Sequence, residues 1–246
     1  RIILDHCGPR AADKVHVIHC GVDTRQFRAI RPSAGERDTR PFSILSIGTI
    51  HEVKGQPILV DACRRLKDQG VPFALHFVGD GPDLDQLREH VERRGLTEEV
   101  TLHGRKTRAE VIELLRRADV LAAPSVPTRD GRREGIPVVL IEAMAAGVPV
   151  VASRLSGSPE LVEDGVCGLL AEPRDADALA DALLRLADDP MLRRRLAEAA
   201  RRRIEHDFDL QTCAERLVAR FRGGGELPTS LPVDVPPVRP GVEVPS

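Results

Sequence analysis

The most regular feature of the sequence is an alternation of short apolar runs with longer amphipathic stretches. The apolar runs lie at 43–47, 74–78, 100–103, 120–123, 148–152 and 168–171. Between them, apolar residues recur at helical spacing, as at Leu179, Leu183 and Leu186. Because the short runs are mostly apolar along their whole length, they are typical of parallel strands covered on both faces. The repeated strand-then-helix order predicts an α/β fold with a doubly wound, Rossmann-like parallel sheet.

The segment before this alternation predicts little structure of its own. Residues 1–20 have the pattern of a helix end and a short strand at 15–18, which is too little for a domain. Residues 21–41 are mostly polar and contain breakers such as Pro32 and Gly35, so they are expected to form a linker.

The alternating region, 42–206, is expected to be the main domain, and two different segments follow it. Residues 190–222 have a helical pattern that is interrupted near 207–209, so 207–222 is expected to be a separate helix. Residues 223–246 are rich in Gly and Pro and lack apolar periodicity. This tail is predicted to be disordered, because it cannot bury enough surface to offset its ordering entropy.

Composition describes a globular protein without a strong electrostatic preference. Hydrophobic residues make up 41% of the 246 residues, charged residues 30%, and the net charge is −2. Bulk charge therefore favours neither nucleic acid nor an anionic membrane as a partner. Two basic runs, 193–195 and 201–203, fall in a helical pattern, where a solvated helix face is the simplest interpretation.

The cysteines and the chain ends bear on the cellular setting. The five cysteines are widely spaced and form no CxxC pair, which argues against a disulfide framework and a structural zinc site. The simplest interpretation of this cysteine pattern is a protein of the reducing cytoplasm. The chain begins with Arg1 rather than Met, so the sequence does not decide whether a leader precedes it.

The most informative local segment is 134–147. Pro137 suits the first position of a helix, and Gly147 suits the left-handed residue that ends one, so a helix is predicted over 137–146. Its N-terminus would offer free N–H groups to an anion. Glu134 lies just before this end, and Glu142 lies in the second turn.

Two carboxylates beside an anion site suit a ligand with hydroxyl groups on both sides of a phosphate, as in a nucleotide-sugar. The alternative is that Glu134 is a solvated loop acid and Glu142 a surface acid. Glu142, however, lies in an otherwise apolar helix, where a carboxylate needs a partner.

A second segment carries a candidate phosphate ligand. The first apolar run ends at Gly48, and Lys54 follows six residues later, before a helix that begins near Pro57. A lysine at this place could neutralise a diphosphate. An ordinary surface lysine is the open alternative.

These segments form part of a longer series. In order along the chain, the series comprises Gly48, Lys54 and Gly55; Gly79 to Pro82; Ala118 to Val120, Pro124 and Ser125; Glu134 and Glu142 to Ala145; and Gly157, Pro159 to Val162, Gly165 and Gly168 to Leu170. Over residues 14–222 it resembles the C-terminal, donor-binding domain of the family 4 retaining glycosyltransferases, which have the GT-B fold. The sequence of residues 133–137, Arg-Glu-Gly-Ile-Pro, resembles that of the branch of the family that builds exopolysaccharides such as colanic acid.

The resemblance implies roles for individual residues. Glu134 and Lys54 would be the catalytic residues, Glu134 facing the donor sugar and Lys54 the diphosphate, while Glu142 would bind the ribose. The full set of implied donor-binding residues is Gly48, Thr49, Lys54, Gly104, Arg105, Glu134, Gly135, Ile136, Val138 and Glu142. No metal and no cofactor is implied beyond the nucleotide-diphosphate sugar.

Two departures from the family pattern matter. Thr49 stands where the family has an arginine, so one phosphate-binding cation is missing. The family's acceptor domain would precede this chain, and residues 1–20 would be the end of that truncated domain.

Weaker motifs favour structural interpretations. Gly79-Asp80-Gly81 is expected to be a tight turn, with Asp83 capping the next helix. Asp83 and Asp85 form a DxD string, which at a helix start is more simply explained by the helix dipole than by a metal. The histidines show no metal-ligand spacing.

The predicted function is glycosyl transfer from a nucleotide-sugar, with retained configuration, to a glycan or lipid-linked acceptor in polysaccharide or glycoconjugate biosynthesis. A nucleotide-sugar epimerase of the same fold and a non-catalytic nucleotide-binding module stay open. The expected location is cytoplasmic or peripheral at the inner face of the membrane. Without its acceptor domain the chain is expected to be inactive, and self-association through Leu210, Leu217 and Phe221 would follow if these side chains are exposed.

Overall fold

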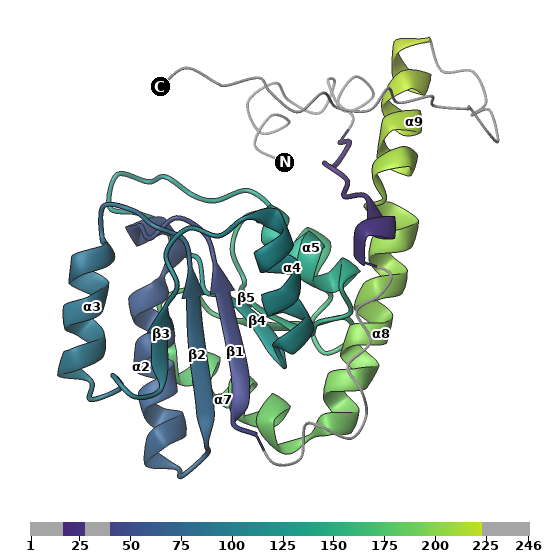
Figure 1. The fold of residues 1–246 in the computed structure, drawn as a ribbon. Helices are drawn as coiled ribbons and strands as arrows, with labels where there is room; N and C mark the ends of the chain where they lie inside the picture. The colour runs from purple at the N-terminus through teal and green to yellow at the C-terminus, as the bar shows by residue number, and fades with distance from the viewer. Residues whose placement is uncertain (1–16, 28–39, 223–246) are drawn as a thin grey trace.

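The computed structural model describes residues 17–27 and 40–222. Its centre is a six-stranded parallel sheet in the order β3-β2-β1-β4-β5-β6 (Figure 1). The strands are β1 (Phe42–Ile47), β2 (Phe73–Val78), β3 (Val100–Leu102), β4 (Val120–Ala123), β5 (Val150–Ser153) and β6 (Leu169–Ala171). The predicted fold is confirmed, and each predicted apolar run supplies one strand. Strand order reverses between β1 and β4, and ligands of such sheets bind at the carboxyl ends beside this reversal.

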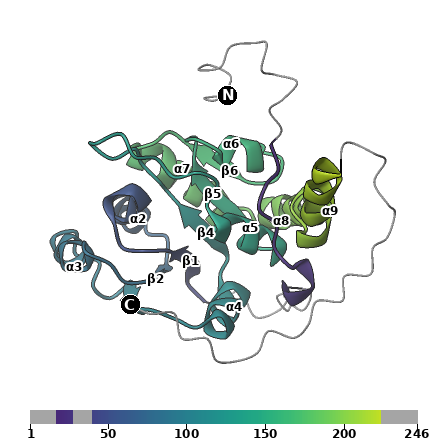
Figure 2. The same cartoon turned by 90° about the horizontal axis from the view of Figure 1, so that it is seen from above.

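Helices cover both faces of the sheet (Figure 2). They are α2 (Gln56–Asp68), α3 (Leu84–Arg93), α4 (Arg108–Arg117), α5 (Val138–Ala145), α6 (Ser158–Leu161), α7 (Ala176–Asp188), α8 (Pro190–Asp207) and α9 (Leu210–Phe221), with short 3₁₀ turns η2 (Thr24–Phe27) and η3 (Glu52–Lys54). One core packs α2, α3 and α7 on the sheet, and a second packs α4, α5 and α8 on its other face. The burial of the central strands between two helical layers explains why their sequences are mostly apolar on both faces.

The helical structure is interrupted between α8 and α9, as the pattern predicted. The first described segment, residues 17–27, hydrogen-bonds to the backbone at this interruption. The N–H of Val22 donates to the carbonyl of Phe208 at 3.0 Å, and the N–H of Leu210 donates to the carbonyl of Val22 at 3.0 Å. The strand predicted at 15–18 is wrong for Val17 and Ile18, which belong to no strand, and its first two residues lie outside the described part. Val22 forms a single bridge to Asp209 instead.

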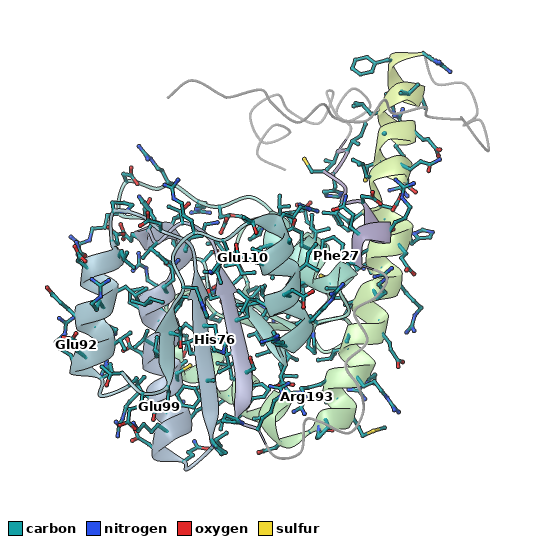
Figure 3. The ribbon with its side chains drawn as sticks, viewed as in Figure 1. Phe27, His76, Glu92, Glu99, Glu110 and Arg193 are labelled. Atoms are coloured by element: carbon teal, nitrogen blue, oxygen red, sulfur yellow. The ribbon has the colours of Figure 1, made fainter. Side chains whose placement is uncertain are left out.

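The basic runs of α8 are only partly a solvated face, and that prediction was wrong for three residues: Arg193, Arg201 and Arg203, of which Arg203 donates to the carbonyl of Glu160 at 2.8 Å. Arg193 donates to the carbonyl of Ala187 at 3.1 Å and lies 5.6 Å from the ring centroid of Phe42 (Figure 3). Arg201 donates to the carbonyl of Ala145, at the end of α5. Helix-end carbonyls lack partners within their helix, and these guanidinium groups supply them. Arg194, Arg195 and Arg202 are exposed, as predicted.

Several predictions concern the ends of the chain. Most of the predicted linker and the whole tail at 223–246 lie outside the described residues, as does Cys7. The four described cysteines are free. No helix in the described part is long and apolar enough to cross a membrane. On α9, Leu210, Leu217 and Phe221 are exposed, the last by 82%.

Candidate functional site

The loops that follow β1, β2 and β4 pack directly against one another, and glycines make this possible. A Cβ atom on Gly79 would lie 1.9 Å from the carbonyl oxygen of Gly48, and one on Gly55 would lie 2.0 Å from the carbonyl oxygen of Pro124. Both glycines also have positive φ, at 138° and 66°. These positions therefore admit only glycine without displacement of the backbone. The result is a tight cluster of loops at the carboxyl ends of the strands.

Lys54 is held over the first of these loops. It ends η3, whose first turn is capped by the ring of His51, and Gly55 follows it in the left-handed conformation. A Cβ on Gly48 would lie 3.4 Å from Cε of Lys54, so the lysine stem lies along the glycine backbone. The Lys54 side chain is only 25% exposed. It is therefore not the ordinary surface lysine of the open alternative.

Glu134 receives the ammonium group of Lys54. Lys54 Nζ donates to Oε1 of Glu134, and Ser125 Oγ donates to Oε2 of Glu134 at 2.5 Å. The Glu134 side chain is 16% exposed and Ser125 is buried. Both carboxylate oxygens have a donor, which compensates for the loss of water around a partly buried charge. Glu134 is thus not a solvated loop acid, and Ser125 is a contact that the sequence prediction did not include.

The helix after Glu134 begins one residue later than predicted. Pro137 has φ −63° and ψ 120° and precedes Val138, which is the first helical residue. Its extended conformation makes it the boundary residue rather than the first helical one. Gly147 has φ 72° and follows the helix end, as predicted. The unpaired N–H groups of the first turn and the helix dipole make this end suitable for an anion.

The backbone before α5 is fixed by a contact from the loop after β5. A Cβ on Gly157 would lie 2.5 Å from Cγ1 of Ile136. Gly135, by contrast, has no atom within 4 Å of its Cβ position among the described residues. One side of the predicted donor-binding backbone is therefore supported by packing, and the other side is open.

Glu142 has the partner that its apolar helix requires. Arg108 Nη1 donates to Oε1 of Glu142 at 3.1 Å, and the Glu142 side chain is 18% exposed. Arg108 Nε also donates to Oε1 of Gln26 at 2.9 Å, and the guanidinium carbon lies 5.8 Å from the ring centroid of Phe27. The sequence predicted that Glu142 needs a partner but did not identify Arg108. Its position at the start of a helix after β3 was the available signal.

The remaining predicted contacts lie at the ends of β1 and β3. The carbonyl of Gly104 accepts from the N–H of Gly79 at 2.9 Å, which ties the loop after β3 to the loop after β2. Arg105 is 86% exposed on its side chain and lies 3.5 Å from Asp80. The carbonyl of Thr49 accepts from Gln56 Nε2 at 3.0 Å. Thr49 thus supplies a backbone contact at the place where the family pattern has a cation.

Two weaker predictions concern titratable groups near this edge. Asp83 precedes α3 as predicted, but its side chain makes no capping hydrogen bond, so that role was wrong. His103 Nε2 lies 3.1 Å from His76 Nδ1, and burial lowers the pKa of both rings. Asp85 pairs with Arg88 at 2.6 Å. Within the described ranges, no three His, Cys, Asp or Glu side chains gather in a way that could hold a metal ion.

Comparison with known proteins identifies the family of this fold and site. Residues 27–203 match the model of the glycosyl transferases group 1. The chain is 39% identical over 208 residues to a putative colanic acid biosynthesis glycosyltransferase, WcaL, of Escherichia coli, a match that covers 84% of this chain and 50% of that protein. The chain therefore spans about half the length of this curated relative.

Solved structures give the same result. The crystal structure of Anabaena Alr3699/HepE in complex with UDP superposes with a TM-score of 0.74 and 26% identity, covering 86% of this chain and 58% of that one. The C-terminal domain of a group 1 glycosyl transferase, LpcC, of Francisella tularensis is covered completely, with 78% of this chain, a TM-score of 0.65 and 25% identity. The chain belongs to the group 1 glycosyl transferases, and its parallel sheet flanked by helices is the Rossmann-like α/β arrangement of the GT-B fold.

Proposed function

We propose that the protein transfers a sugar from a nucleotide-diphosphate sugar, with retention of configuration, to a glycan or lipid-linked acceptor in polysaccharide or glycoconjugate biosynthesis. The observation that carries this proposal is the contact between Lys54 and Glu134 beside the N-terminus of α5. The site places a cation, an anion-binding helix end and a carboxylate within one group of loops. A diphosphate joined to a sugar requires these three kinds of contact. The related HepE protein, whose structures contain UDP and UDP-glucose, supports a donor of this class.

In this proposal the donor replaces the ion pair between Lys54 and Glu134. The diphosphate takes over Lys54 and binds the free N–H groups at the start of α5. Glu134 then accepts hydrogen bonds from sugar hydroxyl groups, and Ser125 keeps one carboxylate oxygen in place. Lys54 thus exchanges one anion for another, and Glu134 exchanges the ammonium group for hydroxyl donors, so neither group is left unpaired during binding. Gly104 and Arg105 would border the nucleobase, and Glu142 the ribose.

Charge stabilisation is the main contribution that these residues can make to the reaction. As the bond between sugar and diphosphate breaks, negative charge grows on the leaving oxygen. Once the donor has displaced Glu134 from Lys54, Lys54 and the N-terminus of α5 would face this oxygen and stabilise the charge that develops on it. The acceptor hydroxyl would attack from the leaving-group side, which retains the anomeric configuration. Because Thr49 replaces the family's arginine, Lys54 carries more of this task.

The acceptor is proposed to bind outside the described residues. All the candidate donor contacts lie between Gly48 and Glu142, in the loops after the strands, in η3 and in the first two turns of α5. Transfer requires a second reactant held against the donor, an effect worth about 7–11 kcal/mol of barrier. We therefore expect the chain by itself to bind donor without appreciable transfer, and the whole protein to be required for turnover.

Two experiments test this function. Calorimetry with a panel of UDP-, GDP-, ADP- and dTDP-sugars should find at least one that binds the chain. The whole protein should then transfer that sugar to a glycan or lipid-linked acceptor, and NMR of the product should show the donor's anomeric configuration. Conversion of the donor to an epimer without transfer would assign the protein to another enzyme class. Binding without any turnover by the whole protein would indicate a nucleotide-binding module.

A further inference from the structure

Arg108 makes more specific contacts than a surface arginine at a helix start requires. It is the first residue of α4, and its guanidinium group contacts Glu142, Gln26 and Phe27. Glu142 lies on α5, whereas the other two residues lie in η2, which is remote in sequence. One side chain therefore joins a carboxylate of the candidate site to the segment that precedes residues 28–39.

The Phe27 ring, which lies against the guanidinium group of Arg108, is held in place by its surroundings. Phe27 is 2% exposed and belongs to the core that includes α4, α5 and α8 (Figure 3). Its carbonyl and that of Thr24 each lie 3.4 Å from the guanidinium nitrogens of Arg201. The ring of Phe27 therefore cannot follow Arg108 if the arginine moves. A guanidinium plane over an aromatic ring, with Nε and Nη1 directed to two different acceptors, has little freedom to rotate.

The contact on Glu142 is one-sided. Arg108 bonds to Oε1, and no other described residue donates to Oε2 of Glu142. A carboxylate with one oxygen bonded to a guanidinium group is restricted in rotation, and its second oxygen stays available to a ligand. A vicinal diol such as that of ribose presents hydroxyl donors to such an oxygen.

We propose that Arg108 is a positioning residue for ribose recognition: it orients Glu142 towards the 2′ and 3′ hydroxyl groups and makes that orientation depend on the placement of η2. This inference rests on the proposed binding of a nucleotide donor. It assigns to one residue the distinction between ribose and deoxyribose. A lysine at this position would keep the charge but could not contact Gln26 and Glu142 in one fixed plane.

The test measures the affinity of the chain for UDP and 2′-deoxy-UDP, and for GDP and 2′-deoxy-GDP. The variants are Arg108→Gln, Arg108→Lys and Gln26→Ala. The matched control is Arg117→Gln, which removes an exposed arginine from the other end of the same helix. The wild-type chain should prefer the ribonucleotide. Arg108→Gln should weaken ribonucleotide binding about tenfold and deoxyribonucleotide binding much less, so that the two affinities converge.

The other variants separate orientation from charge. Arg108→Lys should lose most of the preference while it keeps part of the affinity, and Gln26→Ala should reduce the preference a few-fold with Arg108 present. Arg117→Gln should change neither quantity. Thermal melts identify any variant that has lost its fold. If an Arg108 variant unfolds, Gln26→Ala still tests the positioning role, because truncation of the exposed Gln26 side chain should leave the fold intact.

Three results would overturn the inference. An equal loss for both sugars in Arg108→Gln would mean that the arginine supplies only general positive charge. Unchanged affinity would mean that it has no part in binding. If the wild-type chain binds neither nucleotide nor any nucleotide-sugar, the proposed function itself fails, and the positioning role fails with it.

Discussion

The candidate site contains two carboxylates that meet the same physical requirement in different ways. The Glu134 cluster (Lys54, Ser125 and Glu134) is assembled from loops at the carboxyl ends of β1 and β4. The Glu142 cluster (Gln26, Phe27, Arg108 and Glu142) joins α4 and α5 to η2, which precedes the first strand in sequence. The carboxylates are almost equally shielded, at 16% and 18% exposure. What differs is the cation, because Lys54 is 25% exposed and Arg108 is 54% exposed.

This difference indicates how each cluster should respond to change. An ion pair that is shielded on both sides loses more when one partner is removed, because the remaining charge is left without water. A pair with an exposed cation loses less, because solvent replaces the partner. The Glu134 cluster should therefore affect both stability and binding, and the Glu142 cluster mainly binding.

The largest effect is expected from breaking the loop packing under the Glu134 cluster. Gly55→Ala would force a Cβ to within 2.0 Å of the Pro124 carbonyl, next to Ser125, and would strain a φ of 66°. We expect a loss of about 3 kcal/mol in the free energy of unfolding, measured by urea denaturation. Gly70→Ala is the matched control, because Gly70 has φ 73° but no atom within 4 Å of its Cβ position among the described residues. It should lose only about 1 kcal/mol, from backbone strain alone.

Equal losses in the two glycine variants would contradict this account. They would mean that the loops after β1 and β4 move apart easily and that Lys54 is not held by their packing.

The next effect separates stability from binding within the Glu134 cluster. Lys54→Ala should lower the free energy of unfolding by about 1–2 kcal/mol, because Glu134 keeps only Ser125 as a donor. Donor affinity should fall by about 1–3 kcal/mol in calorimetry, because the diphosphate loses its cation. Adding Glu134→Gln to Lys54→Ala should restore most of the stability and none of the affinity. Recovery of affinity in the double variant would show that Lys54 acts only by neutralising Glu134.

A smaller effect is expected from Glu142→Ala. Donor affinity should fall by about 1–2 kcal/mol, because the ribose loses a charged acceptor. The unfolding free energy should change little, because Arg108 is exposed enough to be solvated when it loses its partner. Glu113→Ala is the control, since Glu113 is an exposed acid on α4 paired with Arg116. A stability loss as large as that of Lys54→Ala would erase the distinction between the two clusters.

The sequence predicted the Glu134 cluster better than the Glu142 cluster, for a physical reason. Apolar runs and glycine positions predicted the strands, and residues that follow parallel strands meet at one edge, so Lys54 and Glu134 could be placed together. The partner of Glu142 depends on how α4, α5 and η2 approach one another, which no local pattern encodes. The same limit applies to Arg193 and Arg201, whose acceptors are the ends of other helices.

Two errors of position arose from local rules that the structure overrides. Pro137 was expected at the first helical position, yet its extended ψ makes it the residue before the helix. Asp83 was expected to cap α3. Instead, close packing fixes the backbone of the preceding turn: a Cβ atom added to Gly81 would lie 2.2 Å from the carbonyl oxygen of Ile50. In both cases the residue type suited the helix start, and only the exact contact differed.

The smallest effect is expected from chelation. A divalent ion at the diphosphate would need carboxylates that are free to bind it, but in the proposed complex Glu134 is held by Ser125 and the sugar hydroxyl groups, and Glu142 bonds to Arg108. Asp85 of the DxD string pairs with Arg88 and is 89% exposed. In the proposed complex, Lys54 and the start of α5 would supply the positive charge that a metal ion could otherwise supply. Excess EDTA should therefore change donor affinity by less than about 0.5 kcal/mol in the wild-type chain, against the losses of about 1–3 kcal/mol expected from Lys54→Ala.

A loss on chelation that magnesium or manganese restores would show that Lys54 and the helix end do not neutralise the diphosphate by themselves. Asp83→Asn and Asp85→Asn would then identify whether the DxD string holds the ion.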